Sequence, residues 1–158
     1  MTEVLRPGVL DGVRVAVAGT GPLGEAVADR AQALGATLAD DAPGVLVVDG
    51  AALFASAPGV DGVRAALDGA WAAIQPHAAG EKLIVLLAPW PGDAHAEAAR
   101  AGLENLARTL SIEWARLGIR PVAIHPGTAT AAEEVAELAA FLSSAAGAYY
   151  SGCRFDLR

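Results

Sequence analysis

Short apolar runs alternate with stretches of helical spacing along this chain, and this alternation limits its possible folds more than any other feature. The apolar runs cover residues 13–19, 44–50, 82–89, 119–127 and 153–157. Stretches whose apolar residues recur at helical spacing separate them, at residues 22–34, 59–75, 95–110 and 131–145. The runs are rich in valine, leucine and isoleucine, which is typical of strands buried on both faces. The order predicts one α/β domain, residues 1–158, built on a parallel sheet.

The segment 36–41 (ATLADD) is too close to the second apolar run to form a full strand before it. Only about ten residues lie between Leu34 and Val45, and two parallel strands need a crossover of about a dozen or more. We therefore expect this segment to be a stub at most, and the sheet to have about five strands.

Charge and cysteine content exclude several classes of function. The formal net charge is −7, which argues against nucleic acid or an anionic membrane as partner. Cys153 is the only cysteine, so no intrachain disulfide forms, and no spacing of His, Asp or Glu suggests a metal site. The longest apolar run is too short to span a bilayer, and the N-terminus lacks a signal-peptide pattern, so we expect a cytoplasmic protein.

A glycine-rich turn follows the first run. In "GTGPLG", Gly19, Gly21 and Gly24 stand between a predicted strand and a predicted helix, the context in which such a turn holds a dinucleotide's diphosphate. Asp40 lies about 20 residues on, near the expected position of a ribose-binding acid. The alternative is that the glycines permit a tight turn and close packing. Asp49 ends the second run, where we expect a cap rather than a ligand contact.

The helix at residues 95–110 has two faces that need burial. Large residues at helical spacing form one stripe: Leu103, Leu106, Leu110 and Trp114. Smaller residues and one isoleucine form a second: Ala98, Ala101, Gly102, Asn105, Thr109 and Ile112. Only a narrow strip between them is clearly polar. Further along, Thr130 and Glu133 have the spacing of a capping box for the helix that follows.

Two segments carry a family resemblance. Residues 99–127 (ARAGLENLARTLSIEWARLGIRPVAIHPG) resemble the active-site helix and next strand of the short-chain dehydrogenase/reductase (SDR) family, and residues 133–157 resemble its last helix and strand. The resemblance extends back to Val13. It implies a Rossmann-like, doubly wound parallel sheet, NAD(P) in active members, and dimers or tetramers. Compared with that family, the chain lacks the segment that supplies the second and third strands, part of the cofactor half.

The family's catalytic positions are empty of catalytic groups here. The tyrosine and lysine of its Tyr-x-x-x-Lys motif fall on Ala96 and Arg100, its serine on Ala88 or Pro89, and its asparagine on Ala66. Alanine has no proton to transfer, and arginine does not titrate near neutral pH. The Asn-Asn-Ala-Gly signature of the cofactor floor reads DGAA, and the glycine turn is one residue short. These departures predict that catalysis is lost and that no cofactor binds.

The helices that the resemblance pairs with a second subunit are retained. They span residues 59–75 and 95–117, and the last strand and helix would form another interface. The expected interface residues are Trp71, Ala98, Gly102, Asn105, Thr109 and Ile112. The leading hypothesis is a non-catalytic subunit that assembles with an active SDR partner, or with itself.

Two alternatives remain open. One is an active NAD(P)-dependent oxidoreductase in which His95 or His125 donates the proton and Arg100 holds the ribose. The other is a small nucleotide-binding module that uses the glycine turn without redox chemistry.

Overall fold

The computed structural model describes residues 5–158 and places their strands in one parallel sheet. The sheet has six strands in the order β2-β1-β3-β4-β5-β6, and every neighbouring pair is parallel. They are β1 (Arg14–Ala18), β2 (Thr37–Leu38), β3 (Val45–Asp49), β4 (Lys82–Leu87), β5 (Ile119–His125) and β6 (Arg154–Asp156). The helices are α1 (Pro22–Ala33), α2 (Gly50–Ala55), α3 (Gly59–Ile74), α4 (Ala94–Glu113) and α5 (Ala132–Ser143), with short 3₁₀ turns η1 (Gln75–His77), η2 (Ala115–Leu117) and η3 (Ala145–Gly147).

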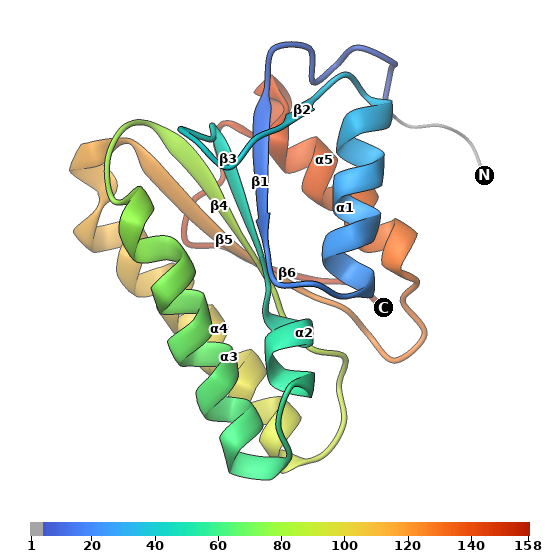
Figure 1. The fold of residues 1–158 in the computed structure, drawn as a ribbon, viewed down its shortest axis with the longest axis vertical. Helices are drawn as coiled ribbons and strands as arrows, with labels where there is room; N and C mark the ends of the chain where they lie inside the picture. The colour runs from blue at the N-terminus through green and yellow to red at the C-terminus, as the bar shows by residue number, and fades with distance from the viewer. Residues whose placement is uncertain (1–4) are drawn as a thin grey trace.

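Helices cover both faces of the sheet, as Figure 1 shows: α1 and α5 lie on one side, and α3 and α4 on the other. In β4, Leu83 and Val85 pack under α1 and α5, whereas Ile84 and Leu86 pack under α3 and α4. Successive strand residues point to opposite faces, so both faces need apolar side chains. The predicted α/β class and doubly wound parallel sheet are confirmed.

The stub at residues 36–41 becomes a short edge strand, β2. It pairs with β1 through two residues, Thr37 beside Arg14 and Leu38 beside Val15. The chain then turns back at once, and Arg14 holds the turn by donating to the backbone oxygen and to Oδ1 of Asp41, both at 2.7 Å. The sheet thus has one strand more than the five expected, but the connection is too short for a longer β2.

Two details near helix starts differ from the sequence prediction. Helix α2 was not expected, because six residues are too few to show a helical period. The predicted capping box of α5 does not form, and only half of such a box occurs one residue later: the Glu134 carboxylate accepts from the Ala131 N–H at 2.9 Å, whereas Ala131 has no side-chain acceptor. The Thr130 hydroxyl instead accepts from the Gly127 N–H at 2.8 Å and closes the preceding loop.

Neither a candidate membrane-spanning helix nor a candidate metal site occurs among the described residues. No helix there is long and apolar enough to cross a bilayer. Within the same residues, no three His, Cys, Asp or Glu side chains gather in a way that could hold a metal ion.

Candidate functional site

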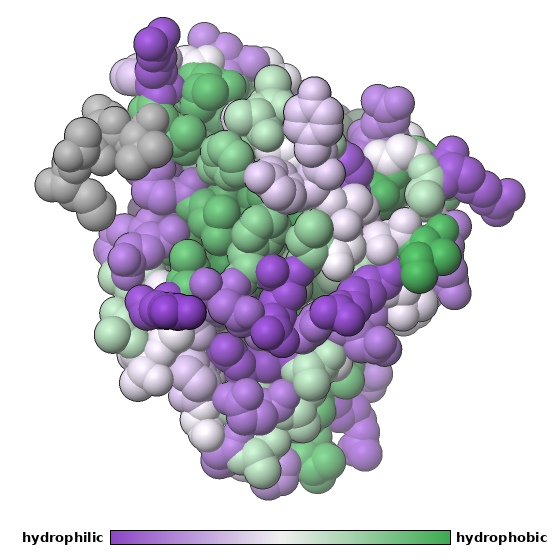
Figure 2. Space-filling view, turned by 180° about the vertical axis from the view of Figure 1, so that it is seen from behind, coloured by the Kyte–Doolittle hydropathy of each residue, from purple (hydrophilic) through white to green (hydrophobic). Residues whose placement is uncertain are grey.

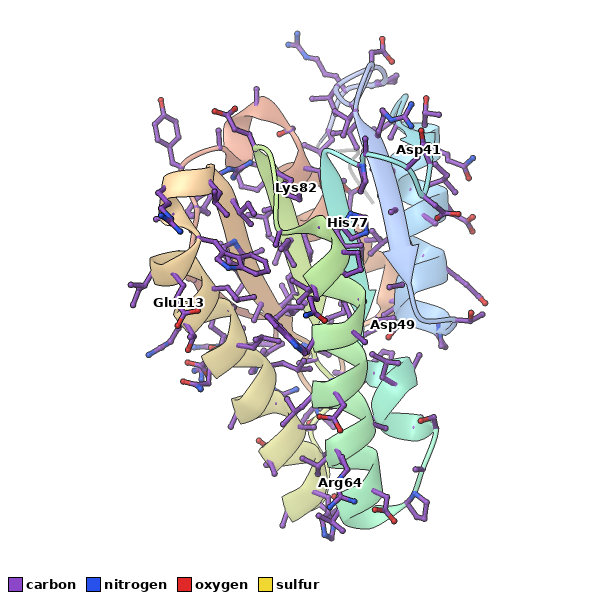
Figure 3. All side chains as sticks on the ribbon, turned by 60° about the vertical axis from the view of Figure 1, so that its left-hand side comes forward. Asp41, Asp49, Arg64, His77, Lys82 and Glu113 are labelled. Carbon is purple, nitrogen blue, oxygen red and sulfur yellow. The ribbon has the colours of Figure 1, made fainter. Side chains whose placement is uncertain are left out.

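The residues singled out for cofactor and catalysis gather at the carboxyl edge of the sheet. The glycine turn follows β1, Asp49 ends β3, Ala88 and Pro89 follow β4, and Pro126 follows β5. In parallel α/β sheets this edge is where ligands bind. Figure 3 shows Asp49 at this end of the sheet, beside the start of α2.

Asp49 is fully buried and caps two helices at once. Its Oδ1 accepts from the N–H of Ala52 in α2 at 2.9 Å, and its Oδ2 accepts from the N–H of Gly24 in the first turn of α1 at 2.8 Å. A carboxylate at a helix N-terminus is stabilised by the unpaired N–H groups and by the helix dipole. The expected capping role of Asp49 is confirmed, and it extends to α1, which the sequence did not indicate.

The glycines of the turn are packed against Asp49 and α2. A Cβ at Gly21 would lie 2.7 Å from the Cβ of Ala52 and 3.0 Å from Oδ2 of Asp49, and one at Gly24 would lie 3.1 Å from the same oxygen. Gly19 has φ of +90°, where a side chain would strain the backbone. Close packing inside the chain is therefore enough to require all three glycines.

The first turn of α1 is a poor fit for a diphosphate. Pro22, its first residue, has no N–H, and the N–H of Gly24 already binds Asp49. The Asp49 carboxylate would also repel a phosphate placed there, since like charges repel most strongly where water is excluded. The start of α1 is thus occupied by a negative charge from the chain itself.

Asp40 is exposed and lies apart from Asp49. With Val15, Val17 and Leu38 it lines a hollow of about 210 Å³ between β1, α1 and β2. Drug-sized ligands usually occupy pockets of roughly 300–1,000 Å³, so this hollow is too small for a dinucleotide.

The four positions that the resemblance assigns to catalytic groups contribute here to packing and to contacts between loops. Ala66, Ala88 and Ala96 are buried apolar residues without a proton to exchange. The mostly buried Arg100 uses its Nη1 to donate to the backbone oxygens of Pro89 at 2.6 Å and Pro126 at 2.9 Å. One guanidinium thus ties the loop after β4 to the loop after β5.

A second side chain joins the same two loops. The indole N–H of Trp90 donates to the backbone oxygen of Thr130 at 3.0 Å. A Cβ at Gly127 would lie 2.5 Å from the backbone oxygen of Leu157, so the residues after β6 also cover the loop after β5. Trp90 was not predicted to take part, because nothing in the pattern "PWPG" indicates its distant partner, Thr130. These contacts hold the loops after β4, β5 and β6 together at the carboxyl edge of the sheet.

The two histidines named as alternative proton donors differ in their surroundings. His95 is exposed near the start of α4, with Nδ1 3.8 Å from Oδ2 of Asp93. His125, at the end of β5, is 3% exposed, and its Nε2 is buried without a hydrogen-bond partner among the described residues. Burial and, to a smaller extent, the Arg100 charge lower the pKa of its imidazole from 6.5 to about 4. His125 is therefore neutral at physiological pH.

Helices α3 and α4 pack on each other and leave an exposed outer face. Ala98, Asn105, Thr109 and Ile112 are exposed there, Ile112 to 78%, together with Trp71, whose ring lies 6.1 Å from that of Trp114. Gly102 differs from its neighbours. A Cβ at this position would lie 2.6 Å from Leu67 Cδ2, so its small size serves the contact with α3 and carries no information about a second subunit.

An aromatic cluster at the C-terminal edge was missed by the sequence analysis. Tyr150 lies between Phe141 of α5 and Phe155 of β6, with ring centroids 6.2 Å and 5.3 Å away, and Tyr149 beside it is almost fully exposed. Figure 2 shows the molecule from behind the view of Figure 1, with apolar residues gathered on this face beside a band of hydrophilic ones. The sequence carries one sign of this cluster, because four of its eight aromatic residues follow residue 140.

Comparisons with known proteins show the fold. No protein-family model matches the sequence. Similar solved structures include BdcA from E. coli (TM-score 0.71, 20% identity, covering 95% of this chain and 100% of that one). Another is a citronellol catabolism dehydrogenase, AtuB, from Pseudomonas aeruginosa PAO1 (TM-score 0.73, 20% identity, covering 98% and 96%). A third is a short chain dehydrogenase from Mycobacterium smegmatis (TM-score 0.66, 21% identity, covering 100% and 96%). The chain therefore has the fold of the short-chain dehydrogenases, as predicted.

Proposed function

We propose that this chain is a non-catalytic subunit with the SDR fold, which assembles with an active short-chain dehydrogenase and supports its structure or substrate pocket. The observation that carries the proposal is the set of contacts at the carboxyl edge. Buried alanines stand where the resemblance places catalytic groups, and Arg100 bonds to the carbonyls of Pro89 and Pro126. The four positions that the resemblance assigns to catalysis therefore offer no proton donor, and the loops around them are tied to each other.

The proposal includes the absence of a bound dinucleotide. Asp49 supplies the negative charge at the N-terminus of α1, and Gly21 and Gly24 pack against it. A cofactor would have to displace or tolerate this buried carboxylate. Removing one partner of a buried, hydrogen-bonded charge typically costs about 2–5 kcal/mol, which opposes dinucleotide binding.

Two surfaces support the assembly part of the proposal. The α3–α4 face exposes Trp71 and Ile112, large apolar groups of the kind that become buried at subunit contacts. The C-terminal edge exposes Tyr149 beside the Phe141–Tyr150–Phe155 cluster. A short-chain dehydrogenase is the partner whose own helices would match the α3–α4 pair, and a second copy of this chain is the variant of this proposal.

Calorimetric titration with NAD(H) and NADP(H) tests the cofactor part. We expect no heat of binding for the parent chain at up to millimolar dinucleotide. Asp49→Asn keeps a hydrogen-bond acceptor but removes the charge, so any affinity that appears only in this variant would identify the carboxylate as the obstacle. Micromolar binding by the parent chain would overturn the proposal, and hydride transfer in addition would establish an active oxidoreductase.

Light scattering after size-exclusion chromatography tests the assembly part. The chain is co-expressed with full-length SDR proteins encoded in the same genome, and the mass of the complex is measured. Ala98→Leu and Ile112→Asp alter the exposed α3–α4 face without burying new atoms inside the chain, and Ala33→Leu on α1 is the matched control. We expect the first two variants to lose the complex and the control to keep it. A monomer under every condition would contradict the proposal.

A further inference from the structure

A large hollow lies at the amino edge of the sheet, opposite the candidate site. It has a volume of about 940 Å³, and its lining includes the first residues of β1, β3, β4 and β5 and the ends of α4 and α5. Ligand pockets usually span roughly 300–1,000 Å³, so the hollow is large enough for a metabolite. Figure 3 shows the separation, with Lys82 near the opposite end of the sheet from Asp49.

Lys82 stands out in the lining of this hollow. It is the only lysine in a chain that otherwise carries arginine at every basic position. It is only 9% exposed, although lysine is almost never so buried without a partner. Within residues 5–158 no hydrogen bond or ion pair reaches its ammonium group. Burial lowers the pKa of Lys82, as expected for a cation without a compensating charge.

The other charged residues of the lining are already engaged. Arg14 is paired with Asp41 at 2.7 Å. Arg120 donates to the backbone oxygen of Gly147 at 2.9 Å. Burial lowers the pKa of its guanidinium, and the negative charge of Glu81 opposes this shift. Lys82 is therefore the unbalanced charge of the hollow, and it is positive in a chain whose formal net charge is −7.

We propose that this hollow binds a small molecule carrying a carboxylate or phosphate group, with the Lys82 ammonium as its charged contact. Burial of most of the Lys82 side chain removes water from around its ammonium group, which is unfavourable unless the charge is paired, and a bound anion supplies that pairing. The guanidinium of Arg120 and the hydroxyl of Ser151 line the same hollow and offer further donors. Binding here is independent of catalysis and of subunit assembly.

The single lysine makes a direct measurement practical. Reductive methylation with ¹³C-formaldehyde keeps the charge and labels two amines of the full chain, Lys82 and the N-terminus. The labelled protein is titrated with inorganic phosphate and, separately, with citrate, at ionic strength held constant with potassium chloride. We expect a saturable change in the Lys82 resonance, and a rise in its pKa, with at least one of the two. Saturation with phosphate alone identifies a phosphate ligand, and saturation with citrate alone a carboxylate.

Variants give a second, independent readout. Lys82→Met removes the charge while preserving the buried stem, and we expect it to raise the melting temperature without ligand and to weaken anion binding about tenfold or more. Lys82→Arg should keep most of the binding. Arg64→Met, which removes an exposed charge on α3, is the control for general ionic effects and should bind as the parent does. A Lys82 resonance that responds no more than the N-terminal amine, or equal binding by Lys82→Met, would overturn the proposal.

Discussion

The stability of the folded chain should depend on pH through one buried histidine, His125. Its imidazole is 3% exposed, Nε2 has no partner among the described residues, and the Asp156 carboxylate is 4.0 Å from Nδ1. Burial and the Arg100 charge lower its pKa from 6.5 to about 4. Between these two pH values the unfolded chain takes up a proton and the folded chain does not. Stability is therefore fully present above pH 6.5 and is lost as the pH falls towards 4.

The magnitude follows from the difference between the two pKa values. One pKa unit corresponds to about 1.4 kcal/mol, so the loss approaches about 3 kcal/mol near pH 4 and is about 2 kcal/mol at pH 5. The range from pH 6.5 to 5 isolates His125. Glu104 and Asp93, whose carboxyl pKa values are lowered by hydrogen bonds from Arg154 and from the Ala96 N–H, contribute only below their ordinary values of 4.5 and 3.8.

Urea unfolding at several pH values between 7.5 and 5 measures this effect. The parent chain should lose about 2 kcal/mol over the range, whereas His125→Phe, which keeps a ring but cannot titrate, should lose much less. His95→Asn is the control, because His95 is exposed, and it should follow the parent. If His125→Phe lost as much stability as the parent chain, a neutral buried His125 would be refuted.

Substitutions at three further positions test the contacts at the carboxyl edge. Asp49→Ala leaves two helix N-termini uncapped and should lower the free energy of unfolding by about 3 kcal/mol, whereas Asp49→Asn should lose about 1 kcal/mol, both measured by urea unfolding. Arg100→Met leaves the carbonyls of Pro89 and Pro126 without their donor, so we expect a loss of about 2 kcal/mol and faster hydrogen exchange in those loops, partly restored in Arg100→Lys. Gly21→Ala adds a Cβ at extended backbone (φ −169°), so its expected loss of about 1–3 kcal/mol, read from the melting temperature, is steric. An unchanged melting temperature would mean that the turn is open.

The layers of the fold were predictable because each strand is buried on both faces and each long helix repeats its apolar residues. In β4 this requirement leaves an unbroken run from Leu83 to Leu87, which a sequence displays directly. Helix α2 and strand β2 are both short. The conformation of α2 depends on packing against α4, and that of β2 depends on the bond between Arg14 and Asp41. Neither of these contacts leaves a periodic pattern in the sequence.

The candidate site was predictable in position but not in contacts. The spacing of "HAEAAR" places Arg100 one turn after Ala96, but the carbonyls it binds belong to residues 11 and 26 positions away. Asp49 was recognisable as a cap because it ends a strand before a loop, whereas its bond to Gly24 joins residues 25 apart. Lys82 reads as an ordinary strand end, and its burial arises from the strands and helix ends around it. Long-range contacts of this kind come from the assembled fold.

The double role of Asp49 has a consequence for how the protein opens. Helix α1 and helix α2 each depend on one oxygen of the same carboxylate, so neither helix start can fray without disturbing the acceptor of the other. Segments that share a buried contact open as one cooperative unit in native-state hydrogen exchange. The amides of Gly24 and Ala52 should therefore exchange with the same opening free energy and respond together to denaturant. We therefore expect the Asp49 side chain to make α1 and α2, which are distant in sequence, open as a single cooperative unit.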